Sequence, residues 1–238
     1  MDNSLSDPVI AAFIVIPILL AVALVSGAFI AFRRSGATHA TRVAVATGLA
    51  TGVWMAATWV VAASGLLREW DRTPPPFALL VAAIVTASAG MAFSGLGRRL
   101  AQYLPLSALV GVQGFRLPLE LVMHEMHVRG IMPGVMTYTG RNFDILTGIG
   151  AIVVAALLAT GRGGRRLVAV WNVVGLILLL NVVIVAILAT PRFRYFGDQN
   201  LNVWVTYVPF VWLPAVMVVA AFAGHLIIFR ALRLQGTR

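Results

Sequence analysis

The sequence predicts an all-α integral membrane protein, built as a polytopic bundle of seven transmembrane helices. The first observation is the composition: 60% of the 238 residues are hydrophobic and only 11% are charged. The second is the presence of long apolar runs, and the third is the placement of arginines in short clusters between those runs. We therefore expect residues 1–238 to form a single transmembrane domain surrounded by the lipid bilayer.

Each apolar run has about the length that a helix needs to cross the hydrocarbon core, roughly 20 residues. The runs end at arginine or at proline, neither of which favours continuing an apolar helix. The first run follows a tail without basic residues, so it is expected to be a spanning helix and not a cleaved signal peptide. The seven expected spans cover residues 8–32, 43–67, 77–96, 104–128, 143–160, 167–189 and 208–229.

Arginine placement predicts the orientation, because cytoplasmic loops carry the excess of basic residues. The loops on one side hold no acidic residue, whereas the opposite side holds five acidic residues and fewer arginines. We expect the N-terminus outside, the C-terminus in the cytoplasm, and a location in the plasma or inner membrane. The arginines on the expected cytoplasmic side are Arg33, Arg34, Arg42, Arg98, Arg99, Arg162, Arg165, Arg166, Arg230, Arg233 and Arg238.

The composition also excludes several functions. The formal charge of +10 would suggest nucleic acid as a partner for a soluble protein, but here the positive-inside pattern accounts for it. The chain has no cysteine, so disulfides, thiolate metal sites and a cysteine nucleophile are excluded. All 18 basic residues are arginine, which excludes chemistry on a lysine, including a retinal Schiff base.

Polar residues concentrate in the expected fourth span, where they form a stripe along one helical face. At about 100° per residue, Arg116, Glu120, His124 and His127 fall within an arc of roughly 80°. A charge in the bilayer centre costs about 2.5 to 3.5 kcal/mol, so these side chains are expected to face the bundle interior. The spacing of Arg116 and Glu120 would let them pair with each other.

Two interpretations of the stripe remain open. Arg116 and Glu120 could be a neutral buried pair that only specifies packing. The functional interpretation is favoured because the stripe continues into two histidines, which can change charge near neutral pH, and because Asn142 and Asp144 re-enter the membrane at the next helix. Asn142 could also simply cap that helix, with Asp144 in its first turn.

The stripe could alternatively hold a metal. Glu120, His124 and His127 present a carboxylate and two imidazoles on one face, with Asp144 as a possible fourth ligand of a zinc, iron or copper ion. Arg116 would repel a cation there, and the zinc-protease order His-Glu-x-x-His is not present.

Residues beyond the fourth span could complete the pocket. The Gly- and Pro-rich loop before the fifth span could fold back as a lid and bring Arg141 and Asp144 to the stripe. Asn172 and Asn181 lie on nearly opposite faces of the sixth span, and depth favours Asn181 as the one that reaches the stripe. His225 is expected near the cytoplasmic end of the last span, away from the site.

Two functional hypotheses follow from these residues. The first is a protein whose outward-facing pocket on the fourth and fifth helices binds, senses or transports a small anionic or protonatable ligand. Its ligand-binding residues would be Arg116, Glu120, His124, His127, Arg141, Asn142, Asp144 and Asn181. The alternative is an intramembrane enzyme, metal-dependent or acid–base, that uses Glu120, His124 and His127. The sequence resembles no known family over an extended stretch, and the oligomeric state stays open.

Overall fold

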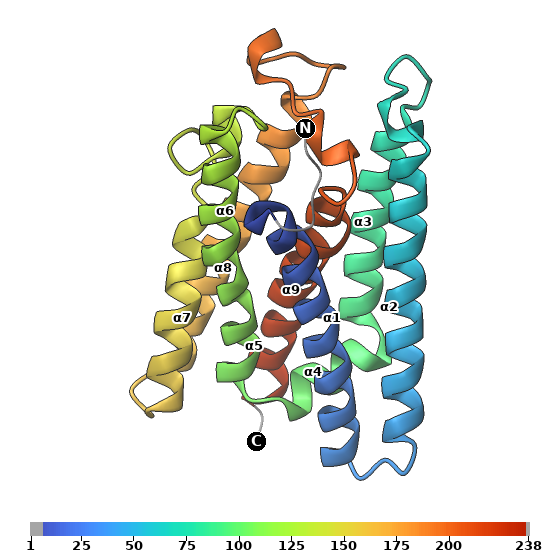
Figure 1. The fold of residues 1–238 in the computed structure, drawn as a ribbon. Coiled ribbons are helices and arrows are strands. Elements are labelled where there is room, and N and C mark those ends of the chain that lie inside the picture. Colours follow the sequence, from blue (N-terminus) through green and yellow to red (C-terminus); the bar gives the residue numbers. More distant parts are fainter. Residues whose placement is uncertain (1–6, 237–238) are drawn as a thin grey trace.

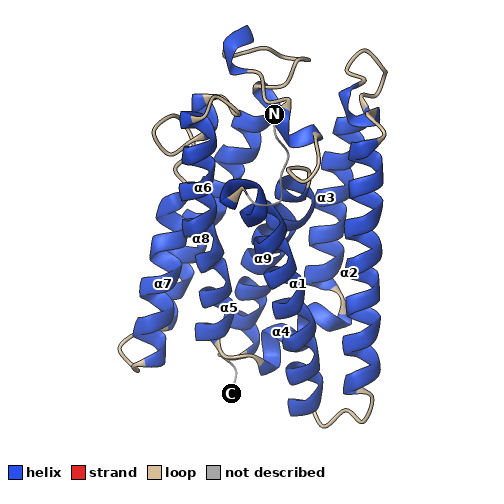
Figure 2. Cartoon of the chain, viewed as in Figure 1, coloured by secondary structure: helices blue, strands red, loops and turns tan. Residues whose placement is uncertain are grey.

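The computed structural model describes residues 7–236, and within that range the chain consists of helices and connecting loops without a strand (Figure 2). The predicted all-α fold class is therefore confirmed. Six helices are long and apolar enough to cross a membrane: Pro8–Arg34, Ala40–Ala63, Pro76–Phe93, Leu106–Val128, Arg165–Leu188 and Leu213–Leu234. The fifth expected span is a shorter apolar helix, α7 (Ile145–Ala159), so the count of seven spans remains a prediction.

The helices run alternately between the two ends of the bundle (Figure 1). At one end lie the turn between α1 (Pro8–Arg34) and α2 (Ala40–Ala63) and the turn between α7 and α8 (Arg165–Leu188). The loops 64–75, 129–144 and 189–212 lie at the opposite end. The arginine-rich turns share the first end, as the sequence predicts, and the assignment of that end to the cytoplasm stays an expectation.

Helix α9 (Val219–Leu234) forms the centre of the bundle. It packs against α3 (Pro76–Phe93), α8, α4 (Gly95–Tyr103) and α5 (Leu106–Val112). A helix surrounded in this way is apolar on most of its faces, which is how the chain buries so many small residues there. Three of its four alanines are buried: Ala221, Ala223 and Ala231.

Helix α4 lies mostly between the third and fourth spans expected from the sequence, residues 77–96 and 104–128. It starts at Ser94, whose Oγ accepts a hydrogen bond from the backbone N–H of Gly97, as a helix N-cap does. Leu100 and Ala101 face the bundle while Arg98 is exposed. With 9 residues, α4 is too short to cross the hydrocarbon core of a bilayer.

Two of the expected spans are not continuous α-helices. The fourth consists of α5, a 3₁₀ turn (Gln113–Phe115) and α6 (Arg116–Val128), and the turn lies just before Pro118, a residue that commonly kinks a helix. The seventh begins with a π-helical turn (Leu213–Val218), which contains Pro214, and then becomes α9. Because proline removes a backbone donor, the hydrogen-bond pattern must change locally. The last span runs from Leu213 to Leu234 and so begins and ends later than the expected 208–229.

A close crossing of α6 and α7 fixes the geometry of the polar site. At Gly148 an added Cβ would lie 2.4 Å from the backbone nitrogen of Leu117 and 3.0 Å from the carbonyl carbon of Arg116. Backbone atoms cannot move aside as a side-chain tip can. We expect Gly148→Ala to lower the free energy of unfolding by about 1 to 3 kcal/mol, the usual cost of overpacking, as measured by thermal or denaturant unfolding in detergent.

Gly90 is the matched control for this substitution, because it is also a helical glycine and nothing lies within 4 Å of its virtual Cβ. Gly90→Ala should be neutral, or stabilising by up to about 1 kcal/mol through helix propensity. Equal stability of the two variants would show that α6 and α7 are not in backbone contact at Gly148.

Candidate functional site

A buried ion pair joins the start of α6 to the start of α7. Arg116 is the first residue of α6 and is 1% exposed, and its Nη1 donates to Oδ1 of Asp144 at 2.9 Å. Asp144 immediately precedes α7 and is also buried. The expected pairing of Arg116 with Glu120 is therefore wrong: the guanidinium reaches across to the neighbouring helix and not along its own.

Glu120 lies one turn after Arg116 and is held by an amide. Both carboxylate oxygens of Glu120 accept hydrogen bonds from Nδ2 of Asn142, at 2.8 and 2.9 Å. The same Nδ2 donates to the carbonyl of Met136, while Oδ1 of Asn142 accepts from the backbone N–H of Asp144 at 3.0 Å. Asn142 is fully buried, and its planar side chain links the Glu120 carboxylate to the backbone of Asp144.

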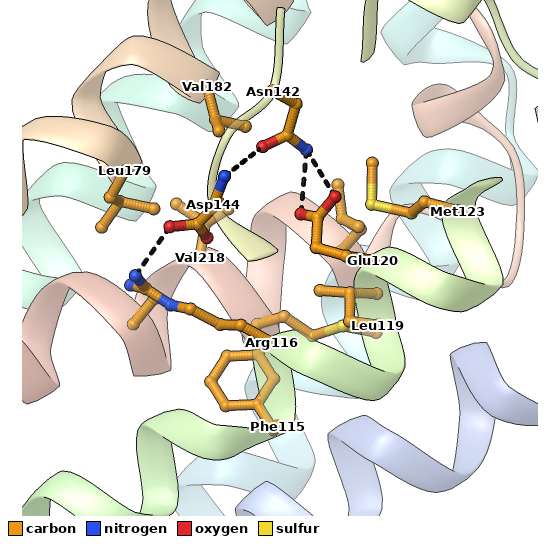
Figure 3. Close-up of a pocket in the computed structure, with 13 residues that line it drawn as sticks. Phe115, Arg116, Leu119, Glu120, Met123, Asn142, Asp144, Leu179, Val182 and Val218 are labelled. Carbon is orange, nitrogen blue, oxygen red and sulfur yellow. Dashed lines mark hydrogen bonds and ion pairs between the residues drawn. The ribbon is translucent and has the colours of Figure 1, made fainter. Parts of the chain in front are cut away.

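These four polar side chains line a small cavity of about 30 Å³, which is room for one or two water molecules (Figure 3). Glu120 approaches from one side and Asp144 from the other, with Arg116 running beneath them. The remaining walls are apolar and come from the 3₁₀ turn before α6, from α6 itself, from α8 and from the last span: Phe115, Leu119, Met123, Leu179, Val182, Leu213, Met217, Val218 and Ala221.

Two properties of the cavity bear on its chemistry. First, Nε and Nη2 of Arg116 are buried and have no hydrogen-bond partner, which is costly for a charged group. Second, one guanidinium faces two carboxyl groups, so with all three ionised the cluster carries a net charge of −1 in a region of low dielectric. A molecule that accepts from Arg116 and brings a proton to the carboxylates would satisfy both groups.

The two histidines of the stripe do not line this cavity. His124 is half-buried and stacks against Tyr138 of the loop 129–144, with ring centroids 4.7 Å apart. Nδ1 of His127 lies 3.3 Å from the carbonyl oxygen of Met132 in the same loop. Both rings therefore support the loop that covers α6.

The expected metal ligands are not assembled. Within residues 7–236, no three His, Asp or Glu side chains form a group that could hold a metal ion, including the set Glu120, His124, His127 and Asp144. Glu120 and Asp144 face the cavity, whereas the imidazoles face the covering loop.

Arg141 and Asn181 also occupy other positions than the sequence analysis expected. The side chain of Arg141 is exposed and lies over the ring of Phe196, 5.2 Å from its centroid. Nδ2 of Asn181 donates to the backbone carbonyl of Arg141 at 2.7 Å, so it anchors the covering loop to α8. Neither side chain lines the cavity.

A second group of buried polar residues lies deeper in the bundle and was not assigned to the site from sequence. Nδ2 of Asn172 donates to the backbone carbonyl of His225, which fixes the amide orientation, so Oδ1 of Asn172 must accept from Nδ1–H of His225 at 2.8 Å. His225 and Gln113 are 0% and 1% exposed. The sequence signal that could have indicated this group is the glycine that faces each polar side chain. A Cβ at Gly175 would collide with His225, and a Cβ at Gly224 would collide with Gln113.

The comparisons with known proteins identify a family. The model of the family described as Domain of unknown function (DUF8737) matches residues 74–233, more than half of the chain. The chain belongs to this family. The DUF8737 segment contains every residue of the cavity and of the deeper polar group, while α1 and α2 lie outside it. No curated protein and no solved structure matches the chain.

Proposed function

We propose that this DUF8737 protein is a multi-pass membrane protein that binds a small ligand through an anionic or protonatable group in the cavity of Arg116, Glu120, Asn142 and Asp144. The observation that carries the proposal is the pair of buried, unpartnered N–H donors on Arg116 beside a cavity that two carboxyl groups also face. Buried polar groups without partners are rare and mark places where a ligand completes the hydrogen bonding.

The charges favour a ligand that carries a proton. The carbonyl oxygen of a carboxylic acid can accept a hydrogen bond from Arg116, and its O–H can donate a hydrogen bond to Glu120 or Asp144. The bound complex then keeps the same net charge as the empty cluster, whereas a second anion would add repulsion in a region of low dielectric. The loop 129–144 covers this end of the bundle, which the arginine pattern assigns to the outside. Binding from that side would serve a carrier or a sensor.

In the enzyme alternative, Glu120, His124 and His127 would act together at one catalytic site. They do not face a common site, because His124 and His127 face the covering loop and Glu120 faces the cavity. Acid–base chemistry on Glu120 and Asp144 would use the same cavity that the binding proposal uses. Binding is therefore the function to test first.

The test compares the small molecules that copurify with two forms of the protein. Wild type and Arg116→Leu/Asp144→Leu are purified in mild detergent, and the molecules released by denaturation are identified by mass spectrometry. We expect a molecule with an acidic or otherwise protonatable group to be retained by wild type and depleted by at least about tenfold in the double variant.

The control is Arg194→Leu/Asp198→Leu, which removes an exposed ion pair from the loop 189–212. It should retain the same molecules as wild type. Identical sets of released molecules from the wild type and from Arg116→Leu/Asp144→Leu would contradict the proposed function.

A further inference from the structure

A second, larger cavity lies on the lipid-facing side of the polar one. Its volume is about 110 Å³, and it lies between α3, α8 and the π-helical turn at the start of the last span. Apart from Asn202 at one end, its lining is hydrophobic, for example Val81 and Ile84 of α3, Val183 of α8, and Phe222 of α9. Water has few partners there, and a hydrocarbon chain would be well solvated.

The two cavities share one wall. Leu179, Val182, Leu213 and Val218 line both the polar cavity and the apolar one. The shared lining consists of leucine and valine, whose side chains change rotamer far more readily than helices move. A single extended molecule could therefore occupy both spaces, with its polar end beside Arg116.

The apolar cavity opens on the surface that the lipid covers. Two of its lining residues, Val85 and Leu180, are 48% and 44% exposed, and they come from α3 and α8 on its two sides. Both helices pack on the last span, which forms the floor between them. A chain from the bilayer thus has a lateral path into the protein that does not cross the loops.

The size of the polar cavity limits the head group. Space for one or two waters admits a carboxyl group, but a phosphate with its ester or a choline would be too large. Among lipids, this size limit leaves those with a single chain and a small head group. The head group must accept a hydrogen bond from Arg116 and share a proton with a carboxylate.

We infer that the two cavities form one binding site for a long-chain monocarboxylic acid, with the carboxyl group at Arg116, Glu120 and Asp144 and the hydrocarbon chain between α3 and α8. This inference rests on the proposed function and names the ligand class. The chain would enter sideways from the bilayer, and the head would displace the water of the polar cavity.

The experiment uses a fatty acid that carries a photoreactive diazirine at the middle of its chain, added to full-length protein in liposomes. After illumination, the labelled positions are found by peptide mass spectrometry. We expect labelling to concentrate on the apolar lining of α3 and α8. An excess of unlabelled oleic acid should suppress it, and oleyl alcohol, which lacks the carboxyl group, should compete much less well.

Two variants fill the apolar cavity from opposite sides, Val183→Trp on α8 and Val85→Trp on α3. Each should reduce labelling by at least about tenfold. A tenfold loss of affinity is expected once the bound hydrocarbon chain buries two fewer methylene groups. The matched control is Ile177→Trp, because Ile177 is on α8 and 59% exposed but lines neither cavity. It should label like wild type.

The outcomes separate this inference from the proposed function. Labelling that is equal in wild type and in both filling variants would overturn the inference, while the copurification test could still support a smaller ligand. Labelling that responds to Val183→Trp and Val85→Trp but not to Arg116→Leu/Asp144→Leu would also overturn it, because the chain would then bind without its head in the polar cavity.

Discussion

Replacing Arg116 by leucine should destabilise the protein strongly, and replacing Asp144 in the same chain should restore most of the loss. In Arg116→Leu, the carboxylate of Asp144 stays buried without its partner at 2.9 Å, which costs about 3 to 5 kcal/mol. In Arg116→Leu/Asp144→Leu neither partner of the ion pair remains, and the Glu120 carboxylate keeps its hydrogen bonds from Asn142. Unfolding in detergent, followed by temperature or denaturant, measures the difference between the two variants.

A second double variant distinguishes the observed pair from the pair that helical spacing favours. Arg116→Leu/Glu120→Leu leaves Asp144 unpaired, so it should be no more stable than Arg116→Leu alone. If this variant recovers stability and Arg116→Leu/Asp144→Leu does not, Glu120 is the true partner of Arg116 and the site geometry described above is wrong.

Asn142→Leu should produce the other large loss. The substitution removes both hydrogen bonds to the Glu120 carboxylate and the acceptor for the backbone N–H of Asp144, all of them buried. Bonds to a charged group contribute about 1.5 to 3 kcal/mol and a stranded buried donor costs about 1 to 3 kcal/mol, so a loss of about 3 kcal/mol or more is expected in the same unfolding measurement.

The control for this prediction is Asn200→Ala, since Asn200 is also a loop asparagine and donates to the Phe196 carbonyl at 2.9 Å, but in a partly exposed place. It should cost about 1 kcal/mol. Adding Glu120→Leu to Asn142→Leu should recover part of the stability, because no carboxylate is then left without donors. Similar losses for Asn142→Leu and Asn200→Ala would mean that Asn142 does not hold the buried carboxylate.

The helices were predictable because their signal is local. An apolar run of the right length between arginines specifies a membrane helix whatever its neighbours are, and the runs that became α1, α2, α3 and α8 have bounds near those expected. The exceptions are the places where the backbone departs from regular geometry. Composition alone does not show that α4 is helical, or that the last span begins with a π-helical turn.

Half of the eight residues expected in the site line the cavity, whereas His124, His127, Arg141 and Asn181 do not. Arg116, Glu120, Asn142 and Asp144 stand out as polar residues in apolar spans, and all four line the cavity. Which of them pair depends on side-chain direction and on the close α6–α7 crossing at Gly148, neither of which spacing along one helix contains.

His225 lies farther from the end of its helix than the expected span implied, because that span ended at residue 229 whereas α9 continues to Leu234. As expected, it does not line the polar cavity, and its ring is bonded to Asn172 of α8.

The short helix α7 has a consequence for the membrane itself. Its 15 residues extend over about 22 Å, less than the roughly 30 Å of an average hydrocarbon core. Beyond its N-terminal end come the buried Asp144 and Asn142 and then the exposed side chain of Arg141, which prefers water or lipid head groups. The prediction that α7 is one of seven membrane spans therefore implies that the bilayer would thin along it, or that head groups would dip toward it, at a cost of a fraction of a kcal/mol per Å of mismatch. Such an asymmetric depression would favour membranes with short or unsaturated lipid chains and would place the head-group layer close to the buried charges.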